Sequence, residues 1–337
     1  MALALLLLLS TMTISGAQAN LSQRKIYEAT KIKAYNEIRS ATNKGNAGNF
    51  TLVYNISDSF PKDLRKLYVS QVEYSSKLFA TFFPNKEVMN IYLYTEKEEK
   101  KIKADPILGR YFDDLGRWFS EWKLGQGLEH NLGLAAWYMK NDQGWQGHAG
   151  LVVHSRASVN SLRKYSVQVM PHEYFHVVQD YYLNVGRDFS WPSSDLYDKY
   201  SPPTFREGSA NTISFALASR SKTAYFDLYK SFLREKLNQR DVKIFSELTS
   251  EVAVVKALTL MENRNNRSDV SEASYSIGQL LYEWVIANYG FSGYRKIIEN
   301  QIKVSSFEEN IKKSLGITVN ELYKKAAPHI LTAFKTA

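Results

Sequence analysis

The sequence predicts an α+β fold, in which a small N-terminal mixed β-sheet with helices precedes a mainly α-helical C-terminal half. Short segments rich in β-forming residues are confined to the chain before about residue 155. From about Val167 onward, apolar residues recur at helical spacing almost to the C-terminus. Strands followed by helices are typical of α+β proteins, and no internal repeat interrupts the pattern.

The first 19 residues have the pattern of a secretory signal peptide. A continuous leucine run, Leu5–Leu9, leads to the small-x-small sequence Ala17-Gln18-Ala19. We therefore expect cleavage after Ala19 and a secreted or periplasmic mature protein. The alternative is an uncleaved anchor, because no Lys or Arg precedes the leucine run. That run is too short to span a bilayer comfortably, which favours cleavage.

Composition limits the function classes that are open to the chain. Hydrophobic residues make up 44% of the 337 residues and charged residues 23%, as in a globular protein with a large core. The absence of cysteine excludes thiolate zinc ligands and a cysteine nucleophile. The net charge is +9, but the basic residues are dispersed and no recognition motif accompanies them, so we expect no nucleic-acid partner. No segment after the leader is apolar enough to span a membrane, so we expect no stable membrane insertion.

Residues 20–160 form the predicted N-terminal part. Hydrophobic periodicity and turn residues predict helices over 20–45, 64–83 and 95–103, and strands over 50–56, 88–94 and 150–154. Residues 105–147 are rich in Gly and Trp, and we expect them to be irregular. They could wall a cleft, but a packed surface subdomain is the commoner structure for such a segment.

Residues 161–337 form the predicted helical part, and no obvious linker separates it from the first part. Its periodicity predicts helices over 168–183, 204–219, 221–238, 252–263, 273–288, 291–302 and 318–335.

The segment Pro171–Gln179 contains a His-Glu-x-x-His motif, which points to metal chemistry. On a helix, His172 and His176 lie one turn apart on the same face and can direct two imidazoles at one ion. Glu173 is placed to act on a water molecule rather than as a ligand. Neutral imidazole nitrogens suit zinc, and a neighbouring carboxylate suits a catalytic base. The alternative is a coincidental pair of surface histidines, which the apolar surroundings of the motif argue against.

A catalytic zinc site needs a third protein ligand, for which we favour Glu207. Glu207 lies at the start of the helix predicted over 204–219, and a rigid helix holds a ligand better than a loop does. Asp195 and Asp198 are the competing candidates, in a predicted loop. A third histidine six residues after the second, as in one class of such enzymes, is excluded because Tyr182 occupies that position.

The two motifs together resemble those of the gluzincin, or peptidase MA-like, zinc metallopeptidases. In that group the His-Glu-x-x-His helix is followed by a Glu-Gly-x-Ala helix, here Glu207-Gly208-Ser209-Ala210. The resemblance covers about residues 165–300 and implies a thermolysin-like fold with zinc in a cleft between the two halves. The interval of thirty residues, 177–206, exceeds the roughly twenty of thermolysin-like members, which affects the expected shape of the cleft.

The resemblance also implies roles for residues outside the motif. Asn211 matches the position of an acidic residue that bonds the first histidine, and would fix the tautomer of His172. Tyr275 matches a tyrosine-containing helix and would donate a hydrogen bond to the oxyanion. The strand over 150–153 would edge the cleft and pair with the substrate backbone. We interpret His148 and His154, which flank that strand, as surface residues.

The sequence therefore predicts zinc-dependent hydrolysis of peptide bonds. His172, His176 and Glu207 would hold one Zn²⁺, and the partner would be a peptide or protein substrate. Glu173 would deprotonate water and later protonate the leaving amine. The alternatives are a catalytically inactive, peptidase-like binding module of the cell envelope and a structural envelope protein without zinc.

Overall fold

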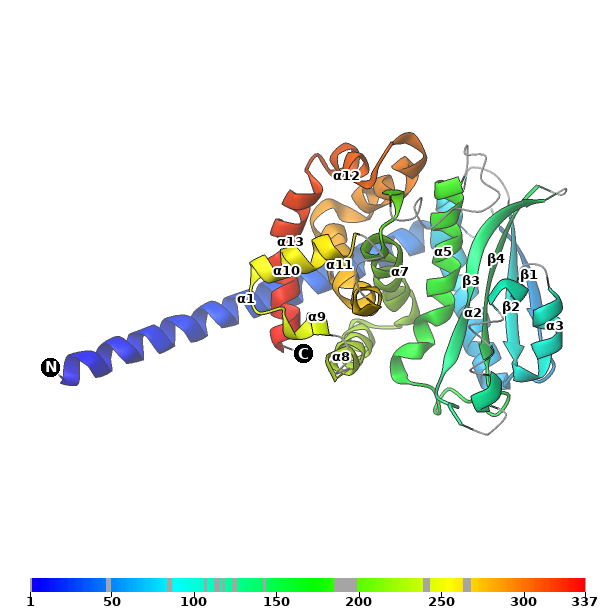
Figure 1. Ribbon diagram of the computed structural model, residues 1–337, viewed down its shortest axis with the longest axis horizontal. Helices are drawn as coiled ribbons and strands as arrows, with labels where there is room; N and C mark the ends of the chain where they lie inside the picture. Colours follow the sequence, from blue (N-terminus) through cyan, green and yellow to red (C-terminus); the bar gives the residue numbers. More distant parts are fainter. Residues whose placement is uncertain are drawn as a thin grey trace.

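The computed structural model describes residues 2–46, 50–83, 87–105, 108–111, 116, 119–122, 126–141, 144–184, 199–238, 243–262 and 268–336. It has a mixed α+β fold that is mainly helical, with one four-stranded sheet in the described chain, so the predicted fold class is confirmed at this level (Figure 1). Its helices are α1 (Ala2–Lys44), α2 (Lys62–Phe79), η2 (Ala80–Phe82), η3 (Glu96–Glu98), α3 (Glu99–Ala104), η4 (Leu108–Tyr111), η5 (Lys164–Gln168), α5 (Val169–Asn184), α7 (Pro203–Ala218), α8 (Lys222–Asn238), α9 (Lys243–Ser246), α10 (Glu251–Leu260), α11 (Ser268–Asn300), η6 (Gln301–Lys303), α12 (Phe307–Leu315) and α13 (Val319–Thr336). Its strands are β1 (Phe50–Ile56), β2 (Glu87–Thr95), β3 (Asn131–Asn141) and β4 (Gly144–Val153).

The sheet has the strand order β1-β2-β4-β3. β1, β2 and β4 are parallel, and β3 pairs antiparallel with β4 as an edge strand, so the predicted mixed sheet is confirmed. The sheet separates two apolar clusters. Met89, Ile91 and Leu151 belong to the large core on the α5 side, whereas Tyr92 and Val152 join a small cluster on the opposite face.

The prediction of irregular structure for residues 105–147 is wrong. The segment expected to be irregular contains β3 and the first residues of β4. The register of β3 against β4 shifts between Leu134 and Trp137, so one strand carries an irregularity there. Such a bulge breaks the two-residue alternation by which a strand is recognised in sequence, and Gly133 weakens the signal further.

The helical half is built around the packing of α7 on α11. Glycines allow the two helices to approach closely, since a Cβ atom on Gly208 would lie 2.2 Å from the backbone carbon of Gly278. The two helices predicted over 273–288 and 291–302 are joined in α11 across a kink at Gly290, where φ is +72°. Glycine reaches this left-handed conformation without the steric penalty of a side chain.

One continuous core serves the sheet and the helices, because buried residues from Tyr27 to Ala333 belong to the same cluster. α5 contacts β3 and β4 on one side and α7 on the other, so it joins the two halves (Figure 1). The predicted division at residue 160 falls between β4 and η5, within this shared core.

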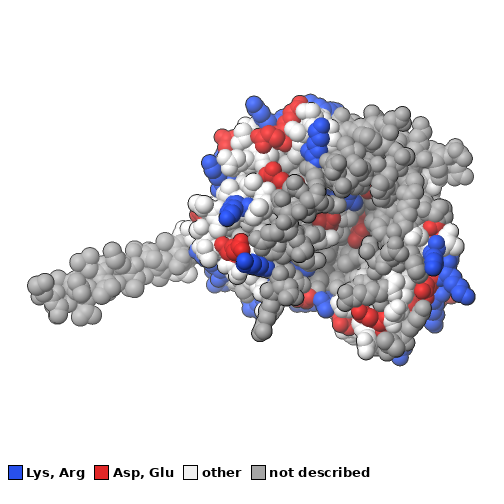
Figure 2. All heavy atoms as spheres, viewed as in Figure 1, with Lys and Arg blue, Asp and Glu red and all other residues white. Residues whose placement is uncertain are grey.

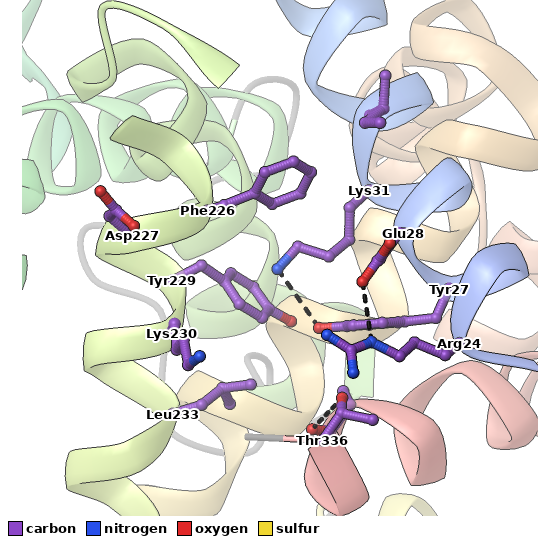
Figure 3. Close-up of a pocket in the computed structure, with 12 residues that line it drawn as sticks. Arg24, Tyr27, Glu28, Lys31, Phe226, Asp227, Tyr229, Lys230, Leu233 and Thr336 are labelled. Atoms are coloured by element: carbon purple, nitrogen blue, oxygen red, sulfur yellow. Dashed lines mark hydrogen bonds and ion pairs between the residues drawn. The ribbon is translucent and has the colours of Figure 1, made fainter. Parts of the chain in front are cut away.

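α1 is helical before residue 20 as well as over the predicted 20–45, and its N-terminal part projects from the body of the protein (Figure 1). Its C-terminal part is anchored by buried Ala34 and Ile38. Lys31 is also buried, with its Nζ 3.4 Å from the ring centroid of Tyr229 on α8 (Figure 3). Within the described residues, no helix combines the length and the apolar character needed to cross a bilayer.

Charged side chains of both signs are interspersed over the coloured part of the face in Figure 2. This agrees with the dispersed basic residues of the sequence, which carries a net charge of +9.

Candidate metal centre

His172 and His176 meet on one face of α5, as their spacing predicts. Their Nε2 atoms are 3.0 Å apart and their rings lie nearly perpendicular, at 88°. Pro171 is the third residue of α5, in the first turn, where its missing N–H costs no helical hydrogen bond. Both histidine side chains are buried, with exposed fractions of 7% and 6%.

Glu207, near the start of α7, completes the cluster. Its Oε2 atom lies 3.3 Å from the Nε2 atoms of both His172 and His176. The three ligand-type atoms are within 4.8 Å of one another, so this group is positioned to hold a metal ion. The competing candidates Asp195 and Asp198 lie outside the described residues.

Gln179 orients His176, a role that the sequence analysis missed. Its Oε1 atom accepts a hydrogen bond from His176 Nδ1 at 2.6 Å, which leaves the Nε2 lone pair of a neutral His176 directed at Glu207 and His172. Its amide donates to the hydroxyl of Ser209 and the carbonyl of Arg206, both on α7. The spacing from His176 to Gln179, three residues on one helix, was the available signal.

Asn211 lies beside His172 and is one of the groups that raise the pKa of that histidine, while its predicted role in fixing the tautomer stays a prediction. However, Nδ1 of His172 has no hydrogen-bond partner of ordinary geometry among the described residues. The amide of Asn211 donates to the carbonyl of Tyr275 at 3.0 Å, and its oxygen faces Gln168 at 3.4 Å. Asn211 therefore ties α7 to α11 beside the first histidine.

Tyr275 is placed next to the cluster by α11. Its ring stacks on that of His172, with centroids 5.9 Å apart and an interplanar angle of 22°. It also lines the cavity in front of Glu173. This location is compatible with the predicted hydrogen bond to an oxyanion, which stays a prediction.

The carboxylate of Glu173 lies against Gly133 of β3. A Cβ atom on Gly133 would lie 1.9 Å from Glu173 Oε1, so the absence of a side chain at Gly133 makes room for this carboxylate. Burial raises the pKa of Glu173 to about 7, with Glu207 adding to the rise and His172 opposing it. A carboxyl group of this kind is suited to taking up and releasing a proton near neutral pH.

The electrostatics of the cluster favour an ionised Glu207. Burial alone would raise the pKa of Glu207, but His176 and His172 lower it well below its ordinary value. Burial lowers the pKa of His176 to about 4, so that imidazole is neutral at pH 7. The pKa of His172 is raised despite burial, because of its contact with Glu207 and the nearby Glu173.

β3, and not the strand over 150–153, forms the edge of the sheet at the site. β4 lies between β2 and β3, which corrects the sequence expectation. His148 and His154 are likewise buried rather than on the surface, with exposed fractions of 5% and 4%. Nδ1 of His148 lies 3.0 Å from the hydroxyl of Tyr92, and Nε2 of His154 lies 3.1 Å from the carbonyl of Trp122.

A cavity of about 270 Å³ adjoins the cluster. Its lining joins His172, Glu173 and Tyr275 to residues of η5 and α8 and to the residues at the start of β3. The site is thus accessible to a small group from solvent.

A comparison with protein-family models, curated proteins and solved structures found no match to the chain.

Proposed function

We propose that this chain is an exported zinc metallopeptidase of the peptidase MA-like type, with a thermolysin-like arrangement of the zinc cleft. The observation that carries the proposal is the convergence of His172, His176 and Glu207 within 3.0–3.3 Å of one another, with Glu173 beside them in a cavity. Two histidines and a glutamate, with room left for water, are the ligand set of catalytic rather than structural zinc sites.

The donor atoms fit zinc. Ligands at the usual 2.0–2.1 Å from a tetrahedral zinc are about 3.3 Å apart, close to the separations here. His172 Nε2 and His176 Nε2 face one another at 3.0 Å, and the buried Oε2 of Glu207 makes no hydrogen bond of ordinary geometry with a described residue. A cation bound among these atoms would satisfy three buried acceptors at once.

Zinc in such a site acts as a Lewis acid that polarises a carbonyl group and makes water a stronger acid. Glu173 takes the proton of the attacking water and later gives it to the leaving amine. Gly133 allows the carboxylate of Glu173 to lie against β3. Tyr275 supplies a hydrogen bond to the developing oxyanion. The edge strand β3 offers backbone groups with which an extended peptide can pair.

The first test is the zinc content of the purified mature protein beginning at Asn20, for the wild type, Glu207→Ala and the control Glu73→Ala. Glu73 is an exposed residue of α2, far from the site in sequence. We expect one zinc per chain in the wild type and the control, and loss of most zinc from Glu207→Ala. A correctly folded wild type without zinc would contradict the proposal.

The second test separates an enzyme from a binding module. Glu173→Gln should keep its zinc and lose about 10²–10⁴-fold in kcat on a peptide library, because proton transfer is removed while the ligands stay. A chain that binds peptides equally well with and without this substitution, and never cleaves them, is an inactive binding module.

A further inference from the structure

The cavity beside Glu173 has a cationic wall. Its lining includes the basic side chains of His130, Arg163 and Lys236. Among the described residues that line it, Glu173 is the one acidic side chain. Burial and the nearby Arg163 lower the pKa of His130, so Arg163 and Lys236 carry the positive charge of this wall at neutral pH.

Arg163 is held in a defined position at the wall. Its Nη1 atom lies 2.6 Å from Glu235 Oε1, and its Nη2 atom lies 3.3 Å from His130 Nε2. Glu235 and Glu129, the carboxylates that contact Arg163 and His130, are not among the residues that line the cavity. They therefore orient the two side chains without presenting their own oxygens to the cavity lining.

Lys236 adds a second cation to the lining. It follows Glu235 on α8. Its Nζ atom lies 5.7 Å from the ring centroid of Phe232, another lining residue. The amides of Asn131, Gln168 and Asn211 complete a polar lining around an opening to Glu173. The cavity lining thus combines the permanent cations of Arg163 and Lys236 with hydrogen-bonding amide groups and the carboxylate of Glu173.

We propose that this cavity binds a carboxylate of the substrate, next to the bond that is cleaved. The inference rests on the proposed peptidase function and adds a substrate class to it. A guanidinium and an ammonium group on one wall match a carboxylate in charge and hydrogen-bonding capacity. At about 270 Å³ the cavity is smaller than sites for drug-sized ligands, so one side chain or a chain terminus is the fitting occupant.

A peptide offers a carboxylate from two sources, an Asp or Glu side chain or its own C-terminus. The zinc-loaded enzyme is incubated with randomised octapeptides, prepared as free acids and as C-terminal amides, and cleavage sites are read by mass spectrometry. Cleavage clustered beside Asp or Glu in both sets identifies the side chain. Cleavage at a fixed distance from the C-terminus, lost on amidation, identifies the terminus. Cleavage that depends neither on a neighbouring Asp or Glu nor on a free C-terminus overturns the inference but supports the proposed peptidase function.

Matched variants on one helix link the preference to the cavity. Lys236→Met should reduce the preference for the carboxylate substrate over its Gln or amide analogue on the order of ten-fold, through KM or kcat/KM. Lys230→Met is the control, because Lys230 lies on the same helix but lines a separate pocket between α1, α8 and α13 (Figure 3). Equal preference in wild type and Lys236→Met would overturn the assignment to this wall.

Binding separates this inference from the underlying function. Zinc-loaded Glu173→Gln is titrated by calorimetry with the best cleaved peptide and its Glu-to-Gln or amidated analogue. We expect binding on the order of ten-fold tighter for the carboxylate form, and loss of this difference in the Glu173→Gln, Lys236→Met double variant. Equal binding of both forms refutes the carboxylate site. Absence of peptide cleavage and of peptide binding refutes the proposed function, and the inference with it.

Discussion

The side chain of Gln179 links the imidazole of His176 to α7, the helix that carries Glu207. Its single side chain accepts from His176 on α5 and donates to Ser209 and Arg206 on α7. It is only 2% exposed, so these hydrogen bonds form in a low-dielectric interior where an unmade bond is costly. The geometry of the candidate metal centre therefore depends on a residue that is not itself a candidate ligand.

Gln179→Leu removes this link at nearly constant volume. We expect zinc affinity to fall about 10–100-fold, because loss of a group that orients a histidine ligand typically has this effect. The measurement is competition for zinc with a chelator of known affinity. Gln71→Leu is the control, since Gln71 is also a buried glutamine but lies on α2. Equal zinc affinity of Gln179→Leu and wild type would show that Gln179 does not orient the ligand.

The sequence predicted the cluster of His172, His176 and Glu207 but neither Gln179 nor Gly133 beside it. The histidine pair is recognisable because helix geometry alone brings positions i and i+4 together. Gln179 and Gly133 depend on contacts with α7 and β3, which helix geometry alone does not specify. Their roles follow from packing between elements far apart in the chain, so a single sequence read without its fold does not reveal them.

α7 and α11 hold Glu207 and Tyr275 in place through a contact between two glycines. The approach of Gly208 to Gly278 leaves no room for a methyl group on either helix. Glu207 immediately precedes Gly208, and Tyr275 lies one turn before Gly278. The spacing of the two helices is thus tied to the positions of the candidate metal ligand Glu207 and the candidate oxyanion donor Tyr275.

Gly208→Ala should destabilise the fold and the site together. A Cβ atom only 2.2 Å from backbone of α11 forces the helices apart, and overpacking of this kind typically costs about 1–3 kcal/mol. We expect a lower midpoint of urea unfolding and weaker zinc binding. Gly116→Ala is the control, because a Cβ atom there meets no described atom within 4 Å. A Gly208→Ala protein with wild-type midpoint and zinc affinity would show that the helices can separate without cost.

Most helices and the strands β1 and β2 were predicted from hydrophobic periodicity to within a few residues, whereas only the C-terminal part of β4 was predicted. β3 was not, since its irregularity and its glycine mask the alternation. α12 was also missed. It is only nine residues long, and Ser306 caps its start with a hydrogen bond to the N–H of Glu309. So short a helix depends on its caps and its packing more than on a long apolar stripe.

One continuous apolar core extends through the sheet and the helices, and the C-terminal part of α1 contributes buried side chains to it. Lys31 is the unusual member of this packing, since it is 4% exposed and its ammonium group rests on the ring of Tyr229. Burial lowers the pKa of Lys31 from its ordinary 10.5 to about 8. In the unfolded chain the same amine keeps its ordinary pKa, so proton binding and folding are linked.

This linkage predicts a pH-dependent contribution to stability. Between pH 8 and 10.5 the unfolded chain binds more protons at Lys31 than the folded protein does, so this contribution rises with pH. The wild type should gain on the order of 2 kcal/mol relative to Lys31→Met from pH 8 to pH 10, measured by urea unfolding. Taking the difference between the two proteins removes the pH dependence of titratable groups that Lys31 does not contact. Lys230→Met, at an exposed position of α8, is the control for the loss of one positive charge, and a flat difference for Lys31→Met would contradict the assignment.

The carboxylate of Glu173 occupies the space left by the missing side chain of Gly133 on β3. His172 and His176 of α5 form the candidate metal centre only together with Glu207 of α7. The site is therefore assembled from three elements that are separate in the sequence. A chain that is only partly folded therefore lacks the complete set of groups. In the exported peptidase proposed above, this arrangement would act as a safeguard, because the ability to cut other proteins would arise only after β3, α5 and α7 have packed together.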